Sequence, residues 1–201
     1  MSVKFNEEIF NIFRLKVPFE KIYTSVFLIK TEEGAVLVDC ATTPSDVDDL
    51  IVPCLEKLGY KLGDIKAIVL THKHGDHAGG LGRVLELAPN IEVVREVRPL
   101  FCGISTYPMS GHTSDSIGVF DGRTRTLISG DGLQGAGVDI YRCYTQEPEE
   151  YIKTVNRIME DRQIENIMFS HAYEPWNSEC AMGRDAVEHC LIECKKYIEE
   201  N

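Results

Sequence analysis

The sequence has no long apolar run and few basic residues for its acidic content. No apolar stretch approaches the roughly 20 residues that a membrane-spanning helix needs. The beginning of the chain, Met1–Phe10, is too polar for a signal peptide, so we expect a cytoplasmic protein without a membrane partner. The 21 Lys and Arg residues against 32 Asp and Glu give a formal net charge of −11. This balance argues against a nucleic-acid partner, because phosphate contacts need clustered basic side chains.

The chain also lacks the cysteine spacing of a zinc ribbon or a redox motif. It has seven cysteines, an odd number, and none of them form a C-x-x-C pair. We expect reduced thiols that pack mainly as small apolar side chains. Cys190 and Cys194 are four residues apart and could bind a soft metal on a helix, but packing is the favoured interpretation. With 201 residues, 43% hydrophobic and 26% charged, residues 1–201 are predicted to form a single globular domain.

Local patterns predict an alternation of strands and helices. Glu32–Gly34 joins two strands into a hairpin at a sheet edge, and Asp121–Gly122 marks another hairpin. Thr43 followed by Pro44 predicts a helix start, and Gly59 closes that helix. The expected strands are Glu8–Leu15 (interrupted by Pro18), Ser25–Lys30, Ala35–Asp39, Ala67–Leu70, Ile91–Val94, Ser116–Phe120, Thr124–Ser129 and Asn166–Ser170. The expected helices are Thr43–Gly59, Ala78–Leu87, Pro148–Glu160 and Gly183–Glu200, with loops over Arg95–Ser110, around one short strand, and over Gly130–Gly137.

The densest group of chemically active side chains is THKHGDH, which spans Thr71–His77 directly after an apolar run. Two His residues spaced i, i+2 would point about 200° apart on a helix, so they could not converge there on one ion. On a loop that leaves a buried strand, with Gly75 loosening the backbone, they can converge. The pattern therefore predicts a metal-ligating loop.

Further polar groups stand beside other predicted strands. His112 lies in GHT before one strand, Asp131 in SGD after the next, and His171 in SH after a third. Strand ends and their loops are where sheets present ligands and catalytic groups. The remaining histidine, His189, lies inside the final predicted helix and is expected to be only solvated or packed.

THKHGDH, GHT, SGD and SH, in this order and spacing, resemble the metallo-β-lactamase superfamily over nearly the whole chain. The resemblance implies an α+β fold, a four-layered αββα sandwich with a dinuclear metal site. It implies that His72, His74 and His112 hold the first metal, that Asp76, His77 and His171 hold the second, and that Asp131 bridges. Asp76 and Asp131 are the predicted catalytic carboxylates. Asp39 takes the place of an acid that braces the His loop, where a strand-end cap is the alternative.

Imidazole and carboxylate ligands without thiolate suit Zn, Fe or Mn, and we expect two divalent ions with zinc as first choice. Two ions about 3.5–4 Å apart can share a hydroxide that is nucleophilic at neutral pH. No activated serine is then required, so Ser129 and Ser170 are expected to be structural. Oxygen-reducing diiron members carry an acid where this chain has His74, which argues against redox chemistry.

The ligand set does not select one substrate, and we expect a small-molecule ester, thioester or lactone. The segment Gly135–Tyr141 resembles the glutathione-contacting loop of glyoxalase II enzymes, but Asp139 stands where their lysine falls. We therefore expect neither their C-terminal helical domain nor their glutathione thioesterase activity. Lactonases of the superfamily use a tyrosine shortly after the bridging acid, where this chain has Gln134. The nearest tyrosines, Tyr141 and Tyr144, could line the pocket, and Phe101, Tyr107, Met109 and Trp176 could form an apolar wall. Core packing is the alternative for all the aromatic and methionine side chains. The alternative functions are phosphodiester hydrolysis, and metal-dependent ligand binding or sensing with little turnover.

Overall fold

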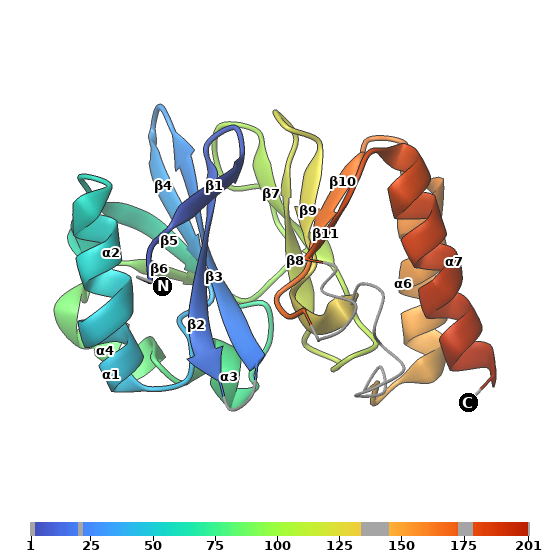
Figure 1. The fold of residues 1–201 in the computed structure, drawn as a ribbon, viewed down its shortest axis with the longest axis horizontal. Helices are drawn as coiled ribbons and strands as arrows, with labels where there is room; N and C mark the ends of the chain where they lie inside the picture. The colour runs from blue at the N-terminus through green and yellow to red at the C-terminus, as the bar shows by residue number, and fades with distance from the viewer. Residues whose placement is uncertain (1–2, 20–21, 134–144, 173–178, 201) are drawn as a thin grey trace. The chain divides into compact units, whose positions relative to one another are not determined.

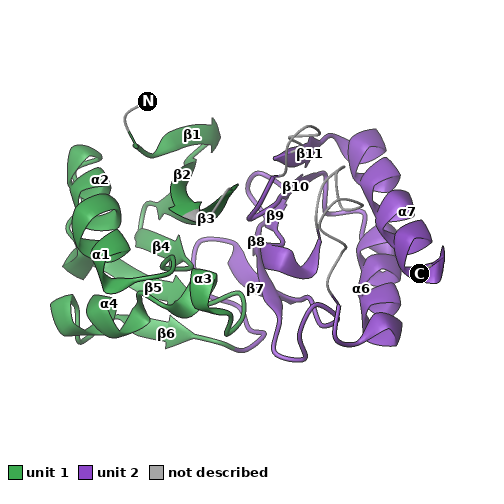
Figure 2. Cartoon of the chain, turned by 60° about the horizontal axis from the view of Figure 1, so that its bottom comes forward, with its two compact units in different colours: residues 1–95 green, residues 96–201 purple. Residues whose placement is uncertain are grey.

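The computed structural model describes residues 3–19, 22–133, 145–172 and 179–200, which are drawn in colour in Figure 1. The chain divides into two compact units, residues 1–95 and residues 96–201 (Figure 2). Each unit consists of one sheet with helices packed on it. The single domain over 1–201 stays a prediction.

The first unit contains a six-stranded sheet in the order β1-β2-β3-β4-β5-β6. Strands β1 to β4 are antiparallel, whereas β4, β5 and β6 run parallel to one another. Parallel neighbours present their carboxyl ends at the same edge of a sheet, so the segments after β4 and β5 lie close together. The strands are β1 (Asn6–Ile9), β2 (Ile12–Phe19), β3 (Ile22–Thr31), β4 (Gly34–Val38), β5 (Ile65–Val69) and β6 (Glu92–Val94).

Three expectations for this sheet were wrong. The single strand over Glu8–Leu15 is a pair, β1 and β2, whose turn includes Asn11 at a φ of +61°, a backbone conformation that Asn tolerates. Strand β2 continues through Pro18, which is tolerated because it lies next to the strand's end. The β3–β4 hairpin forms with its predicted turn, but it lies inside the sheet rather than at its edge, because β5 pairs with β4 and β2 with β3.

The predicted helix after Thr43 forms in three successive pieces. They are α1 (Pro44–Asp46), a π-helical turn (Val47–Ile51) and α2 (Val52–Lys57). Thr43 is the N-cap as predicted: its Oγ1 accepts from the Asp46 N–H at 3.1 Å, and Asp46 Oδ2 accepts from the Thr43 N–H at 2.8 Å. Pro53 has no N–H and its ring would collide with the carbonyl four residues earlier, which the wider π turn avoids. Gly59 closes the segment at a φ of +81°.

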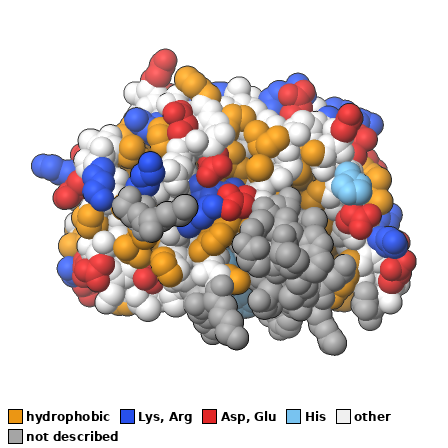
Figure 3. Space-filling view, viewed as in Figure 1, with side chains coloured by type: hydrophobic (Ala, Val, Ile, Leu, Met, Phe, Trp, Pro, Cys, Tyr) orange, Lys and Arg blue, Asp and Glu red, His pale blue; other side chains and the backbone are white. Residues whose placement is uncertain are grey.

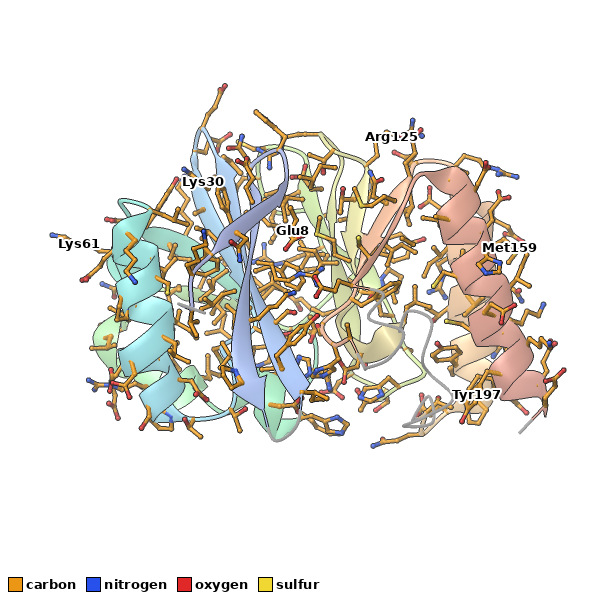
Figure 4. All side chains as sticks on the ribbon, in the orientation of Figure 1. Glu8, Lys30, Lys61, Arg125, Met159 and Tyr197 are labelled. Atoms are coloured by element: carbon orange, nitrogen blue, oxygen red, sulfur yellow. The ribbon has the colours of Figure 1, made fainter. Side chains whose placement is uncertain are left out.

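The helical face of the first sheet forms that unit's hydrophobic core. Leu15, Val26, Leu28 and Leu37 from the strands pack with Ile51 and Leu55 from the helical segment. Lys30, labelled in Figure 4, places its Nζ 5.3 Å from the ring centroids of both Phe13 and Tyr60. The aliphatic part of this basic side chain covers the two rings while its charged end stays near water, so it shields that end of the core from solvent.

The second unit contains a five-stranded sheet in the order β11-β10-β9-β8-β7. The predicted hairpin at Asp121 joins β8 to β9, and β9 and β10 are parallel. The short strand expected within Arg95–Ser110 is β7, whereas β11 was not predicted. The strands are β7 (Ile104–Pro108), β8 (Ile117–Asp121), β9 (Thr126–Ile128), β10 (Asn166–Met168) and β11 (Cys180–Met182).

Two helices cover this second sheet. Helix α6 (Pro148–Glu160) has the predicted bounds, and α7 (Arg184–Glu200) begins one residue after the predicted start. Tyr151, Val155 and Ile158 of α6 pack with Val187 and Leu191 of α7 in the second unit's core. Met159 and Tyr197, labelled in Figure 4, flank this core.

The six described cysteines are all reduced thiols, as expected, and Cys143 lies outside the described residues. Cys194 is in the core of the second unit with Cys190 packed against it, which supports packing over soft-metal binding. Within the described ranges, no helix combines the length and hydrophobicity that a membrane crossing requires.

The Thr43 cap gives a first prediction. Thr43→Ala removes the acceptor for the Asp46 N–H and should lower the free energy of unfolding by about 1 kcal/mol. Urea unfolding followed by circular dichroism measures the change. Ser45→Ala, at an exposed position in the same turn, is the matched control and should change it by less than about 0.5 kcal/mol. Equal effects of the two substitutions would contradict the assigned cap.

Candidate metal centre

The THKHGDH segment follows β5 and divides into a loop and a short helix. His72 and His74 lie in the loop, whereas Asp76 and His77 lie in the one-turn helix α3 (Gly75–Ala78). The predicted helix Ala78–Leu87 is therefore corrected: helical structure already begins at Gly75, and a second helix, α4, covers Leu81–Leu87. His74 is the N-cap of α3 and has an extended backbone (φ −60°, ψ 149°), so it marks the boundary between the ligands in the loop and the ligands in the helix.

The four side chains form two pairs of candidate ligand atoms. His72 Nε2 lies 3.0 Å from His74 Nδ1, and His77 Nε2 lies 3.3 Å from Asp76 Oδ2. His72 and His77 are buried. Each pair thus brings together two donor atoms that one cation could bind.

The buried carboxylate of Asp39 braces this segment from the end of β4. Its Oδ1 accepts from the Thr71 N–H at 2.8 Å, and its Oδ2 accepts from the Thr71 hydroxyl at 2.8 Å. Oδ2 also lies 2.7 Å from His77 Nδ1. Asp39 therefore contacts the His segment as predicted, and the simple strand-end cap is not its role.

These contacts fix which ring nitrogens carry hydrogen. A carboxylate only accepts, so His77 Nδ1 donates to Asp39, and the single hydrogen of the Thr71 hydroxyl goes to Asp39 as well. His72 Nδ1, 3.1 Å from Thr71 Oγ1, must then be the donor of that pair. In the neutral rings, Nε2 of His72 and Nε2 of His77 then carry a lone pair rather than a hydrogen, the state a metal ligand needs. The donor set therefore fits a divalent metal.

In the second unit, Asp131 lies between two histidines. Its Oδ2 is 3.6 Å from His112 Nε2, and its Oδ1 is 3.2 Å from His171 Nε2. Asp131 and His171 follow the parallel neighbours β9 and β10, whose ends are joined by a bond from the Ser129 N–H to the Met168 carbonyl. All three side chains are buried. One carboxylate oxygen for each histidine is the arrangement expected of a bridging ligand.

The loop that carries His112 is anchored by the segment before α6. The Gln146 N–H donates to the His112 carbonyl at 3.2 Å, and the Thr145 hydroxyl donates to the Gly111 carbonyl at 2.5 Å. Gly111 has a φ of +138°, and a Cβ there would lie 2.5 Å from Tyr151 Cα. Only glycine allows this close approach, which sets the position of His112.

The other candidate residues have structural surroundings. Ser129 is buried with its hydroxyl against the backbone carbonyls of Gly130, Leu133 and Met168, as expected of a structural serine. His189 is exposed on α7, as expected. Tyr107 and Met109 belong to the second core and its border. Gln134, the segment Gly135–Tyr141 with Asp139, Tyr144 and Trp176 lie outside the described residues.

Sequence reasoning assigned no role to Thr71 or to Cys40. Thr71 stands inside the THKHGDH motif, so its position beside the first histidine was the available signal. Cys40 donates from both its N–H (2.8 Å) and its Sγ (3.2 Å) to the His77 carbonyl. Burial, with the Asp39 charge beside it, raises the pKa of the Cys40 thiol, which agrees with the role of its Sγ as a hydrogen-bond donor to the His77 carbonyl.

Comparison with known proteins identifies the fold. Residues 21–101 match the model of the metallo-beta-lactamase superfamily. The structure of metallo-β-lactamase FIM-1 from Pseudomonas aeruginosa, in its mono-zinc form, superposes with a TM-score of 0.78 and covers 100% of this chain and 96% of its own, at 14% identity. The chain has the metallo-β-lactamase fold, and part of its first unit matches the superfamily's sequence model. The predicted α+β metallo-β-lactamase fold is thereby confirmed.

The sequence relatives of this chain differ in name and in length. A hydroxyacylglutathione hydrolase from Vibrio campbellii is 30% identical over 164 residues, which are 67% of this chain and 63% of the relative. Ribonuclease J from Mycobacterium tuberculosis is 40% identical over 63 residues, 29% of this chain and 11% of that protein. The chain therefore spans less than two thirds of the length of either relative.

The bracing carboxylate gives a second prediction. Asp39→Asn removes the charged acceptor that orients His77 and, through Thr71, His72, so zinc affinity should fall about 10- to 100-fold. Competition with a chromophoric chelator measures that affinity in metal-free protein to which zinc is returned. Asp48→Asn, at an exposed carboxylate of the same unit that pairs with Arg83, is the control and should leave it unchanged. An Asp39→Asn protein that is folded and binds zinc like wild type would refute the bracing role.

Proposed function

We propose that this chain is a dinuclear metal-dependent hydrolase of a small ester, thioester or lactone. The observation that carries the proposal is the arrangement of its donor atoms. In the first unit, hydrogen bonds at Nδ1 leave the lone pairs of His72 and His77 at Nε2, each beside a second donor atom. In the second unit, Asp131 presents one oxygen to each of two histidines. The metallo-β-lactamase fold supports the union of both sets in one centre.

In the proposed centre the ligands divide between two positions. The first ion would be held by His72, His74 and His112, and the second by Asp76, His77 and His171, with Asp131 as the proposed bridge. Nitrogen and oxygen ligands without thiolate suit zinc, with iron or manganese as alternatives. The likeness to FIM-1, whose structure is of a mono-zinc form, supports zinc as first choice.

Bound divalent ions would supply a hydroxide at neutral pH and would polarise the carbonyl that it attacks. The chain's own residues prepare this chemistry. Asp39 and Thr71 keep two histidines in the binding tautomer, and Asp76 and Asp131 supply negative charge that balances the cations. Because these side chains are held by buried hydrogen bonds, little reorganisation is needed when substrate binds.

The proposal for the substrate class rests on the name of one sequence relative and on the net charge of the chain. The name of the Vibrio campbellii relative, hydroxyacylglutathione hydrolase, supports hydrolysis of an acyl compound. The net charge of −11 disfavours a nucleic-acid substrate, and on the face in Figure 3 the Lys and Arg side chains lie interspersed with Asp and Glu. We therefore propose a small-molecule substrate, with neither nucleic acid nor membrane as partner. The short match to ribonuclease J keeps phosphodiester hydrolysis as the second candidate.

Replacement of the bridging acid tests the proposal. Asp131→Ala removes an oxygen from beside each of two histidines, so kcat/KM should fall at least about 100-fold on whichever substrate wild type hydrolyses. The measurement is a panel of aryl esters, thioesters, lactones and a bis-aryl phosphate with zinc-loaded protein. Chelation should abolish the activity and added metal should restore it.

Asp185→Asn, at an exposed acid on α7, is the control and should keep wild-type activity. Turnover of the phosphate alone would favour the second candidate. Metal binding without turnover of any panel member would favour a ligand-binding or sensing protein. Unchanged turnover in Asp131→Ala would remove the bridge from the proposed centre.

A further inference from the structure

The segment Asp39–Thr42, here called the strap, follows β4 and lies against the end of α3. The N–H and the Sγ of Cys40 both donate to the His77 carbonyl, at 2.8 and 3.2 Å. The Gly80 N–H donates in return to the Ala41 carbonyl at 3.3 Å. The carbonyl of His77 stands at the end of a one-turn helix, where helical partners run out. Cys40 satisfies it from outside the helix.

The backbone of the strap lies so close to Gly79 and Gly80, at the end of α3, that a side chain at either position would not fit. A Cβ at Gly79 would lie 1.9 Å from the Thr42 carbonyl oxygen, and a Cβ at Gly80 would lie 2.2 Å from the Cys40 carbonyl oxygen. Both obstacles are backbone atoms, which cannot swing away as a flexible side chain would. The two glycines are therefore required for the contact itself.

The backbone of the strap is strained on both sides of Cys40. Asp39 and Ala41 have φ values of +62° and +60°, a conformation that non-glycine residues rarely adopt. Such strain persists only where the surroundings hold it, and it clusters at functional sites. Cys40 itself is fully buried, with its side chain directed at the end of α3.

We propose that Cys40 is a positioning residue that fixes the α3 turn, and with it the Asp76 and His77 ligands of the second metal position. His77 is held at two points, its ring by Asp39 and its carbonyl by Cys40. Two points of attachment fix both the position and the direction of Nε2 beside Asp76 Oδ2. His72 and His74 precede α3, so the first position should depend on this contact less than the second position does. The inference rests on the proposed dinuclear centre.

The test compares the two metal affinities of cysteine variants. Metal-free protein is titrated with zinc against a chromophoric chelator, and with Co²⁺ to follow its electronic absorption. In Cys40→Ala one of the two affinities, that of the position with Asp76 and His77, should fall about threefold to tenfold, the effect of losing one hydrogen bond, while the other affinity changes less. Cys40→Ser keeps a donor and should bind both ions as wild type does.

Cys54→Ala is the matched control. Cys54 is a buried thiol of the same unit whose Sγ donates to the Val3 carbonyl at 3.4 Å. Cys54→Ala removes a similar side-chain volume and a similar hydrogen bond, but it should change neither of the two metal affinities. Equal losses in Cys54→Ala and Cys40→Ala would show general destabilisation and would overturn the proposal. If Cys40→Ala does not fold, Cys40→Ser decides: wild-type binding supports the proposal, and a lost second ion contradicts it.

A glycine pair tests the close contact separately. Alanine normally stabilises a helix relative to glycine, and a Cβ at Gly82 in α4 would meet nothing within 4 Å, so Gly82→Ala should hold or raise the melting temperature. Gly79→Ala should instead lower it and weaken the second ion. Wild type that binds no ion would overturn the proposed function itself. Wild type that binds two ions, with Cys40→Ala and Gly79→Ala indistinguishable from it, would overturn only the role of the strap.

Discussion

The first unit's ligand segment depends on the hydrogen bonds that one buried carboxylate, that of Asp39, accepts. A charge taken out of water is costly unless hydrogen bonds replace its hydration. Asp39 receives the Thr71 N–H, the Thr71 hydroxyl and His77 Nδ1, and these bonds connect the segment after β4 to the segment after β5. One carboxylate thus orients His77 directly and His72 through the Thr71 hydroxyl. These two histidines belong to different proposed metal positions.

The same construction serves both units. In each, two parallel neighbours end side by side and the residues that follow them carry the polar groups: Asp39 and the His segment after β4 and β5, Asp131 and His171 after β9 and β10. In each, a backbone bond joins the two strand ends, from the Asp39 N–H to the Val69 carbonyl and from the Ser129 N–H to the Met168 carbonyl. Parallel pairing therefore brings together side chains that are distant in the sequence.

Local chemistry accounts for what the sequence could predict. The Thr43–Pro44 start, the Asp121 turn and the whole of α6 depend on neighbours within a few residues, and each forms as expected. The candidate metal ligands were predicted from the density of THKHGDH and from its resemblance to a family. The position of the β3–β4 hairpin inside its sheet depends on pairing with β5, and the role of Cys40 depends on a residue 37 positions away. No local pattern carries such information.

The shortness of α3 explains why these distant contacts matter. A helix of one turn cannot be stable through its own hydrogen bonds, because the cost of the first turn is not recovered. Its shape must come from outside: from Asp39 on the ring of His77, from Cys40 on the carbonyl, and from Gly79 and Gly80, which let the strap lie against it. The strained strap and the one-turn helix α3 thus stabilise each other through these contacts. The geometry of Asp76 and His77 is consequently a property of tertiary packing, which helix propensity alone would not produce.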